Sequence, residues 1–315
     1  MQKVDRKWGD IMARSIQKMK MKGSNGKKIK KTWFDYLNYI LLALFALICL
    51  YPMIYVLACS FNSGTDYVKG GIYLWPRDVT FENFLLVFND PRLWRSYGIT
   101  ILRTVFGTVL ALLYTSIVGY AMSRKNLRGR SIFYKIFIFT MFFSGGTVPY
   151  YLIIIALGLF DNFLVYIIPC LFSVYNMLVF SNFFRGIPEE IRESAVMDGA
   201  SETRIFFSII LPLSMPVVST VALWIAVGHW NSFYDTMLYT SSDRLWTLQY
   251  YLMKVIKESS LPTNVGGLPS DILNNVSPET VSFAAIIISV IPILIVYPLI
   301  FKMLTKGVVV GSLKG

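Results

Sequence analysis

The segment EEIRESAVMDGASETRIFFSIILPLSMP, residues 189–216, changes character along its length: seven charged residues fill its first part, and the remainder is almost wholly apolar. Pro188 and the two glutamates after it favour a helix N-terminus, and Gly199 stands where a helix C-terminal cap is expected. Ser201 can cap a second helix that continues toward Pro212. The segment therefore predicts a polar helix, a glycine turn and a second helix that enters an apolar environment.

The rest of the chain is too apolar for an ordinary soluble domain. Of its 315 residues, 55% are hydrophobic and 15% charged, and the mean hydropathy is +0.55. A bilayer-spanning helix needs about 20 residues with few charges. Six windows without Asp, Glu, Lys or Arg reach that length: 36–65, 104–123, 136–160, 162–184, 205–234 and 280–301. Lipid offers bare backbone no hydrogen bonds, so these windows should be helices. The sequence predicts an all-α integral membrane protein with six transmembrane helices, at about 37–61, 96–122, 132–157, 163–184, 209–231 and 281–301.

The distribution of positive charge predicts the orientation. If the chain starts inside, the cytoplasmic stretches are 1–35, 124–135, 185–204 and 302–315, and they hold 22 of the 30 Lys and Arg residues. Both termini are then cytoplasmic. A basic N-terminal segment, 1–35, precedes a membrane domain, 36–301, and a tail, 302–315. The basic segment fits contact with anionic membrane lipid, so we expect no nucleic-acid partner.

Three features within the predicted spans carry further expectations. FFSGGTVPYY, residues 142–151, places two glycines and a proline in mid-membrane, which indicates either a kink or the wall of a cavity. Arg103 lies about two turns inside the outer boundary of its span, where its side chain is expected to snorkel toward the interface. The three cysteines all lie within spans and show no disulfide framework, so they are expected to pack: Cys49, Cys59 and Cys170.

The opening segment is similar to the cytoplasmic signature of permease subunits of binding-protein-dependent ABC importers. That signature is Glu-Ala-Ala, three residues, Gly, nine residues, Ile, one residue and Leu-Pro. All spacings fit here, with Ser in place of the first Ala: Glu193, Ser194, Ala195, Gly199, Ile209, Leu211 and Pro212. The resemblance covers essentially the whole chain. It extends to carbohydrate-importer permeases such as the smaller maltose-type permease, and it is closest to permeases for complex oligosaccharides in FFSGGTVPYYLI, LPLSMPVVSTVALW, GHWNSFYD and TKGVVVGSLKG.

The resemblance implies a type I ABC importer permease fold in a bacterial cytoplasmic membrane. Residues 188–212, with Asp198 and Ala200 beside the signature glycine, would form a coupling segment that docks in a cleft of a cytoplasmic ATPase dimer. Glu193 would pair with a basic ATPase residue, and Gly199 would allow the sharp turn. The implied partners are a second homologous permease, the ATPase dimer and an extracytoplasmic sugar-binding protein. Together they would move an oligosaccharide inward by alternating access.

The chain shows no catalytic motif of its own. It lacks a phosphate-binding GxxxxGK[ST] loop, HExxH and GxSxG, and its single histidine makes a poor metal site. We therefore expect no catalytic residue, no metal and no cofactor on this chain, and assign ATP and Mg²⁺ to the partner ATPase.

Sugars are usually held by aromatic faces and polar side chains, so a substrate pathway should offer both. The candidates follow the break in the third span, lie in the fourth, or end the fifth, and packing remains the alternative for each: Tyr150, Tyr151, Asn176, His229, Trp230, Asn231 and Tyr234.

Two other classes of function stay open. An ion-coupled secondary transporter would use ionisable groups inside the spans, and here only His229 lies within the windows, with Arg103 and Asp235 at their edges. An integral-membrane enzyme would have to rely on scattered carboxylates. The sugar, and which permease holds it, stay undetermined at this level.

Overall fold

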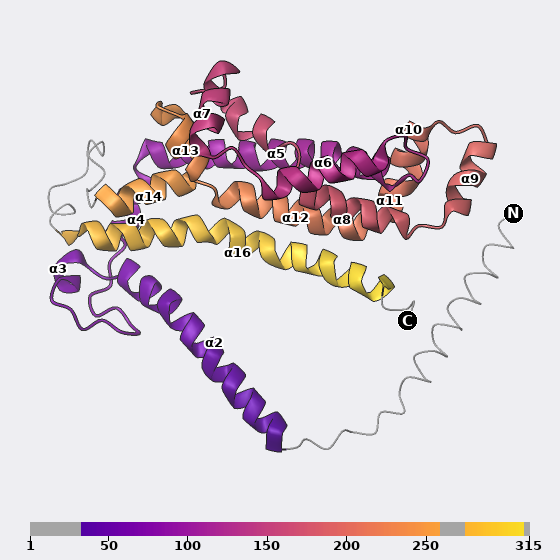
Figure 1. Cartoon of the computed structure of the whole chain (residues 1–315). Coiled ribbons are helices and arrows are strands. Elements are labelled where there is room, and N and C mark those ends of the chain that lie inside the picture. The colour runs from indigo at the N-terminus through magenta and orange to yellow at the C-terminus, as the bar shows by residue number, and fades with distance from the viewer. Residues whose placement is uncertain (1–32, 259–274, 312–315) are drawn as a thin grey trace, which may run out of the picture. The chain divides into compact units, whose positions relative to one another are not determined.

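The computed structural model describes residues 33–258 and 275–311, and within them the regular elements are helices apart from one isolated β-bridge between Asn62 and Val79. The chain divides into two compact units, 1–54 and 55–315. In its described part the first unit is most of helix α2 (Trp33–Ser60), and the second holds all later elements (Figure 1). The predicted all-α class is confirmed for the described residues. The expected basic segment 1–35 lies almost wholly outside them.

Six segments can account for the predicted spans. Three helices are long and apolar enough to cross a membrane unbroken: α2, α5 (Pro91–Ser123) and the Pro278–Ile295 part of α16 (Pro278–Gly311). Three bent pairs bring the total in the described residues to six at most. The pairs are α6 (Arg130–Phe142) with α7 (Thr147–Ala156), η1 and η2 (Phe163–Tyr166, Ile168–Cys170) with α8 (Val174–Arg185), and α10 to α11 (Glu202–Leu213) with α12 (Met215–Asn231).

The bends occur where the sequence cannot continue a helix. Between α6 and α7 the chain turns by 112°, and Gly146 adopts a φ of 89°, in the region that favours glycine. The Ser144 hydroxyl accepts a hydrogen bond from the Gly146 N–H at 3.2 Å, which partners one backbone group freed by the break. The interruption expected at FFSGGTVPYY is therefore present, and it is sharper than a plain kink. The other bends, of 46° and 84°, follow Pro169 and precede Pro216.

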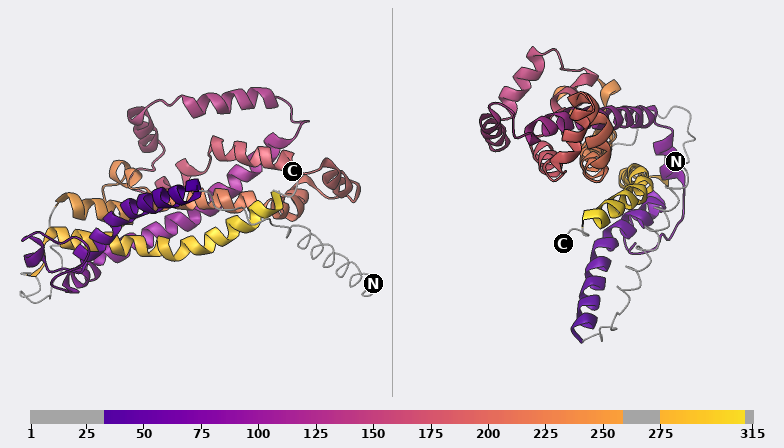
Figure 2. Two further views of the ribbon diagram at one scale, coloured as in Figure 1. Left: turned by 90° about the horizontal axis from the view of Figure 1, so that it is seen from below. Right: turned by 90° about the vertical axis from the view of Figure 1, so that its right-hand side faces the viewer.

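Helix α5 is the central element of the second unit. It packs against α8 and α12, and α16 packs against α12 and α14 (Leu248–Glu258) (Figure 1). Close approach to α8 depends on Gly119, where a Cβ atom would lie 2.7 Å from Cβ of Phe180. By contrast α6 lies at the periphery, as Figure 2 shows, and none of its side chains is buried.

The connecting elements gather at the two ends of the second unit (Figure 1). At one end lie α3 (Gly64–Tyr67), α4 (Glu82–Phe88), α13 (Tyr234–Tyr239), η4 (Asp243–Leu245) and α14. At the other end lie α9 (Glu189–Met197) and α10 (Glu202–Ile205), the helices of the opening segment. In the predicted tail, residues 302–311 continue α16, and residues 312–315 lie outside the described part. The segment with the signature thus sits at the end opposite α13 and α14.

Candidate coupling segment and the buried polar cluster

The turn after α9 has the geometry that the sequence predicts. Gly199 has a φ of 77°. Its N–H donates to the carbonyl of Val196 at 2.9 Å, and the N–H of Ala200 donates to the carbonyl of Ala195 at 3.0 Å. These two bonds form a Schellman motif, which requires a left-handed residue at this position. The predicted glycine cap is confirmed.

The second helix also begins as predicted, but it changes form within one turn. The Ser201 hydroxyl accepts a hydrogen bond from the N–H of Arg204 at 3.3 Å and so caps α10. Residues Phe206–Ile210 then form a π-helix that leads into α11 (Leu211–Leu213). Pro212 cannot donate to the residue four positions before it, and the wider turn accommodates this loss.

The signature residues divide into an inner row and an outer row. The inner side chains are buried or half-buried in an apolar cluster with Phe184, Phe206 and Ile210: Ala195, Ala200, Ile209 and Leu211. The outer positions are exposed: Glu193, Ser194, Asp198, Gly199 and Pro212. Among the apolar side chains of this segment, that of Met197 is the most exposed, at 86%. The inner row therefore holds the segment on the bundle, and the outer row presents a surface.

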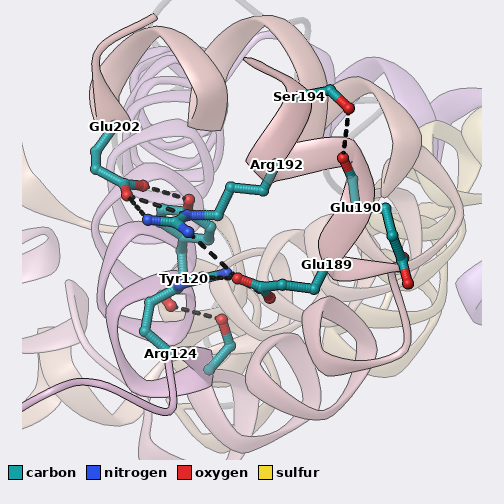
Figure 3. Close-up of polar contacts among 8 residues, drawn as sticks. Tyr120, Arg124, Glu189, Glu190, Arg192, Ser194 and Glu202 are labelled. Atoms are coloured by element: carbon teal, nitrogen blue, oxygen red, sulfur yellow. Dashed lines mark hydrogen bonds and ion pairs between the residues drawn. The ribbon is translucent and has the colours of Figure 1, made fainter. Parts of the chain in front are cut away.

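A network of charged groups fixes α9 to α10 and to the end of α5 (Figure 3). The Arg192 guanidinium donates to Glu189 at 3.2 Å and to Glu202 at 3.0 Å. Glu189 also accepts from Arg124 at 3.2 Å, and the Tyr120 hydroxyl donates to Glu202 at 2.7 Å. Single half-exposed ion pairs contribute little, but a network of several charges has more effect. These contacts favour one orientation of α9 relative to α5.

The network also sets the charge of the segment. The hydrogen bond from Arg124 holds the pKa of Glu189 below its ordinary value, so this carboxylate stays ionised at neutral pH. No described residue forms an ion pair with Glu193, so its exposed carboxylate is not neutralised by this part of the chain. The Ser194 hydroxyl donates to the carbonyl of Glu190 at 2.8 Å. Because this bond lies within α9, the hydroxyl that the Ser-for-Ala departure adds is partnered by the helix itself.

The expectation that Arg103 snorkels is wrong. Its side chain is 1% exposed and pairs with Asp235 of α13, with 2.5 Å between Nη2 and Oδ2. The guanidinium lies over the Tyr166 ring at 4.6 Å, and Nη1 donates to the carbonyl of Ser232 at 3.4 Å. Asp235 folds back onto α5, so the charge is neutralised inside the protein and need not reach the interface.

The candidate pathway residues do not form one site. His229 is buried against Gly107, with 3.5 Å between its Nδ1 and Nε of Arg103. Asn176 is also buried. Trp230 lines a small cavity of about 180 Å³ with residues of α5, α12 and α16. The lining of this cavity is apolar, which does not suit a sugar. Exposed side chains remain at Tyr150, Asn231 and Tyr234, and Tyr151 stacks on Tyr239 at 6.1 Å.

Most of the contacts that order the α9–α10 segment and the cluster around Arg103 could not be predicted from the sequence. Glu189 and Arg192 are three residues apart on one helix, a spacing that signals an ion pair. The other partners are distant in sequence and carry no local signal: Tyr120 with Glu202, Arg124 with Glu189, and Arg103 with Asp235.

Comparison with known proteins identifies the family of this chain. Residues 21–310 match the family described as "Binding-protein-dependent transport system inner membrane component". The chain belongs to this family. It is 37% identical over 283 residues to Protein LplC of Bacillus subtilis, covering 90% of this chain and 95% of that protein. It is 35% identical to the polygalacturonan/rhamnogalacturonan transport system permease protein YtcP of the same organism, covering 91% of this chain and 100% of that protein.

A solved structure resembles the fold of this family member closely. It is the crystal structure of a bacterial ABC transporter involved in the import of the acidic polysaccharide alginate. The TM-score is 0.81 at 35% identity, over 89% of this chain and 99% of the other. The chain is thus a multi-pass membrane protein with the fold of an ABC importer permease.

Proposed function

We propose that this permease imports an oligosaccharide with the energy of ATP, and that its α9–α10 end docks on a separate ATPase in the cytoplasm. The observation that carries the proposal is the hydrogen-bonded turn at Gly199 with an outer row of exposed signature residues. The transport systems named for the relatives, for polygalacturonan or rhamnogalacturonan and for alginate, support a saccharide cargo. The charge distribution supports cytoplasmic termini.

The exposed residues fit a docking role by their chemistry. Glu193 has no ion-pair partner among the described residues, so a basic side chain of the ATPase would form an ion pair with it. Met197 presents a flexible apolar side chain at the tip, of a kind common at adaptable binding surfaces. This chain has no phosphate loop, so ATP and Mg²⁺ belong to that partner.

Alternating access requires motion at the ATPase to reach the spans. The charged network joins α9 to α10 and α5. After α10 the chain runs through the π-helix and α11 and, beyond the 84° bend, into α12. A displacement of the segment would therefore move these helices together. A second permease would cover apolar side chains that this chain leaves exposed, and a sugar-binding protein would dock at the end with α13 and α14. Tyr150, Asn231 and Tyr234 are the pathway candidates with exposed side chains.

Cross-linking tests the docking. Met197→Cys, introduced with the three native cysteines replaced, is labelled with a short thiol-directed photo-crosslinker, which inserts into any neighbouring side chain on illumination, and should then form a covalent product with the ATPase. Ser241→Cys is the control, because Ser241 is also exposed but lies between α13 and η4. A product from Ser241→Cys, or none from Met197→Cys in an active transporter, would overturn the assignment.

Energy coupling is tested separately in proteoliposomes that contain the binding protein. We expect uptake of labelled oligosaccharide to require ATP on the ATPase side and to continue when ionophores collapse the ion gradients. Uptake that follows the ion gradient without ATP would instead support the ion-coupled alternative.

A further inference from the structure

Two arginines at the α9 end of the second unit have no acidic partner among the described residues. Arg130 begins α6, and Arg185 ends α8. The Arg130 Nε donates to the carbonyl of Met122 at 3.0 Å, and Arg185 donates to the hydroxyls of Tyr134 and Ser181. All these acceptors are neutral. Both cations therefore remain uncompensated by charge.

The two guanidinium groups converge on one aromatic ring. Their central carbons lie 5.5 Å and 5.2 Å from the centre of the Tyr134 ring, for Arg130 and Arg185 respectively. The Tyr134 hydroxyl is fixed by contacts with the Ser181 hydroxyl at 2.7 Å and the Met122 carbonyl at 3.1 Å. Two like charges held near one ring repel each other. An anion between them would remove that cost.

The space beside this ring is a pocket. It is open, has a volume of about 340 Å³ and is lined by Arg130, Ser131, Tyr134 and Arg185. The two planar guanidinium groups and the Ser131 hydroxyl suit the oxygens of a phosphate group. A larger cleft that shares both arginines is also lined by Glu189, Glu190 and Glu193, but none of these carboxylates comes within ion-pair distance of Arg130 or Arg185.

The surface that continues from the pocket is apolar. Along α6 the side chains of Ile132, Phe133, Ile136 and Phe139 are 46–64% exposed. An inorganic phosphate ion has no apolar part that could pack on this surface. A phospholipid would place its headgroup at the arginines and its acyl chains along α6, which is part of a membrane span.

We propose that Arg130, Ser131, Tyr134 and Arg185 form a binding site for the phosphate of an anionic phospholipid, in the leaflet at the α9 end of the bundle. The site requires only that the chain lies in a membrane, and so it is independent of the sugar and of the ATPase. The lipid would hold α6 against α8 at a helix whose own side chains are not buried.

Lipid retention measures the proposal. The complete transporter is reconstituted in nanodiscs with equal phosphatidylglycerol and phosphatidylcholine, purified, and its retained lipid is counted by native mass spectrometry. We expect selective retention of phosphatidylglycerol. Arg130→Gln with Arg185→Gln should weaken its binding roughly fivefold for each arginine and roughly 30-fold together. Arg128→Gln is the matched control, since Arg128 is exposed in the same turn but lines neither pocket, and it should retain wild-type lipid.

Other occupants give different results. Displacement of the bound species by millimolar inorganic phosphate, without preference for phosphatidylglycerol, would show a free-anion site and overturn the lipid assignment. Loss of the second permease from the double variant, with lipid retention unchanged, would show that an acidic group of that subunit fills the pocket. Arg130→Lys with Arg185→Lys keeps the charge but not the fork, and it covers the case in which the Gln variant fails to insert. It should bind phosphatidylglycerol with intermediate affinity, and wild-type affinity would contradict the geometry.

Discussion

Replacing Gly199 with valine isolates the role of the turn in transport. A Cβ at this position would meet no atom within 4 Å, so the substitution adds no clash. Its effect comes from the backbone alone, because a φ of 77° is unfavourable for any residue with a side chain and worst for a β-branched one. The turn must then either hold the strain or open and reorient α9.

The magnitude follows from that single dihedral angle. Strain of this kind costs about 1–3 kcal/mol, which shifts the equilibrium between closed and open turns by roughly 5- to 150-fold. We expect Gly199→Val to insert normally and to lose most of its sugar uptake, together with the stimulation of ATP hydrolysis by the binding protein. Gly199→Asn should recover much of both activities, since asparagine tolerates the left-handed region better than other residues with side chains.

A second glycine provides the control for general destabilisation. Gly158 lies between α7 and η1, has a φ of 67° and likewise has no atom within 4 Å of its Cβ position. Gly158→Val therefore adds comparable strain away from the α9–α10 segment. Both activities are measured in proteoliposomes at matched protein content. Normal uptake by Gly199→Val, or an equal loss in Gly158→Val, would refute a specific role of the turn.

Three further outcomes follow from the contacts. Arg103→Met should lower the thermal unfolding temperature in detergent, because it strands the Asp235 carboxylate; the cost for a fully buried pair is about 3–5 kcal/mol and is smaller here, since that side chain is 26% exposed. Gly107→Ala would put a Cβ 2.5 Å from Nε2 of His229, and overpacking of about 1–3 kcal/mol should appear in the same assay, whereas an unchanged midpoint would contradict the packing. The pKa of Glu189 is lowered, so its contribution to stability is present above the ordinary carboxyl pKa and disappears as pH falls through the lowered value. The protection factors of the α9 amides, which are corrected for the intrinsic pH dependence of exchange, should therefore fall as pH drops below the ordinary glutamate pKa, and less so in Glu189→Gln.

The fold could be predicted largely because its determinants are local. The long charge-free windows correspond to helices or to bent helix pairs, and the caps of α9 and α10 follow from Gly199 and Ser201. The break near Gly146 could also be anticipated. The bend before α8 has only Pro169 as a local signal, and the 84° bend before α12 has only Pro216. Such angles are set by packing against α5, which no single window contains.

Arg103 shows why the remainder escapes prediction. A lone arginine in a predicted span has two low-cost outcomes, a path to the interface or an internal partner, and residue spacing cannot separate them. Its partner Asp235 lies 132 positions later, just beyond another span. Only the bend that returns α13 to α5 brings the carboxylate within 2.5 Å. The same reasoning applies to Arg130 and Arg185, which look like ordinary positive-inside residues in sequence but share one ring once α6 and α8 pack. A charge at the end of a span can therefore determine topology and also contribute to a binding site, and only the pairing of helices shows which charges do both.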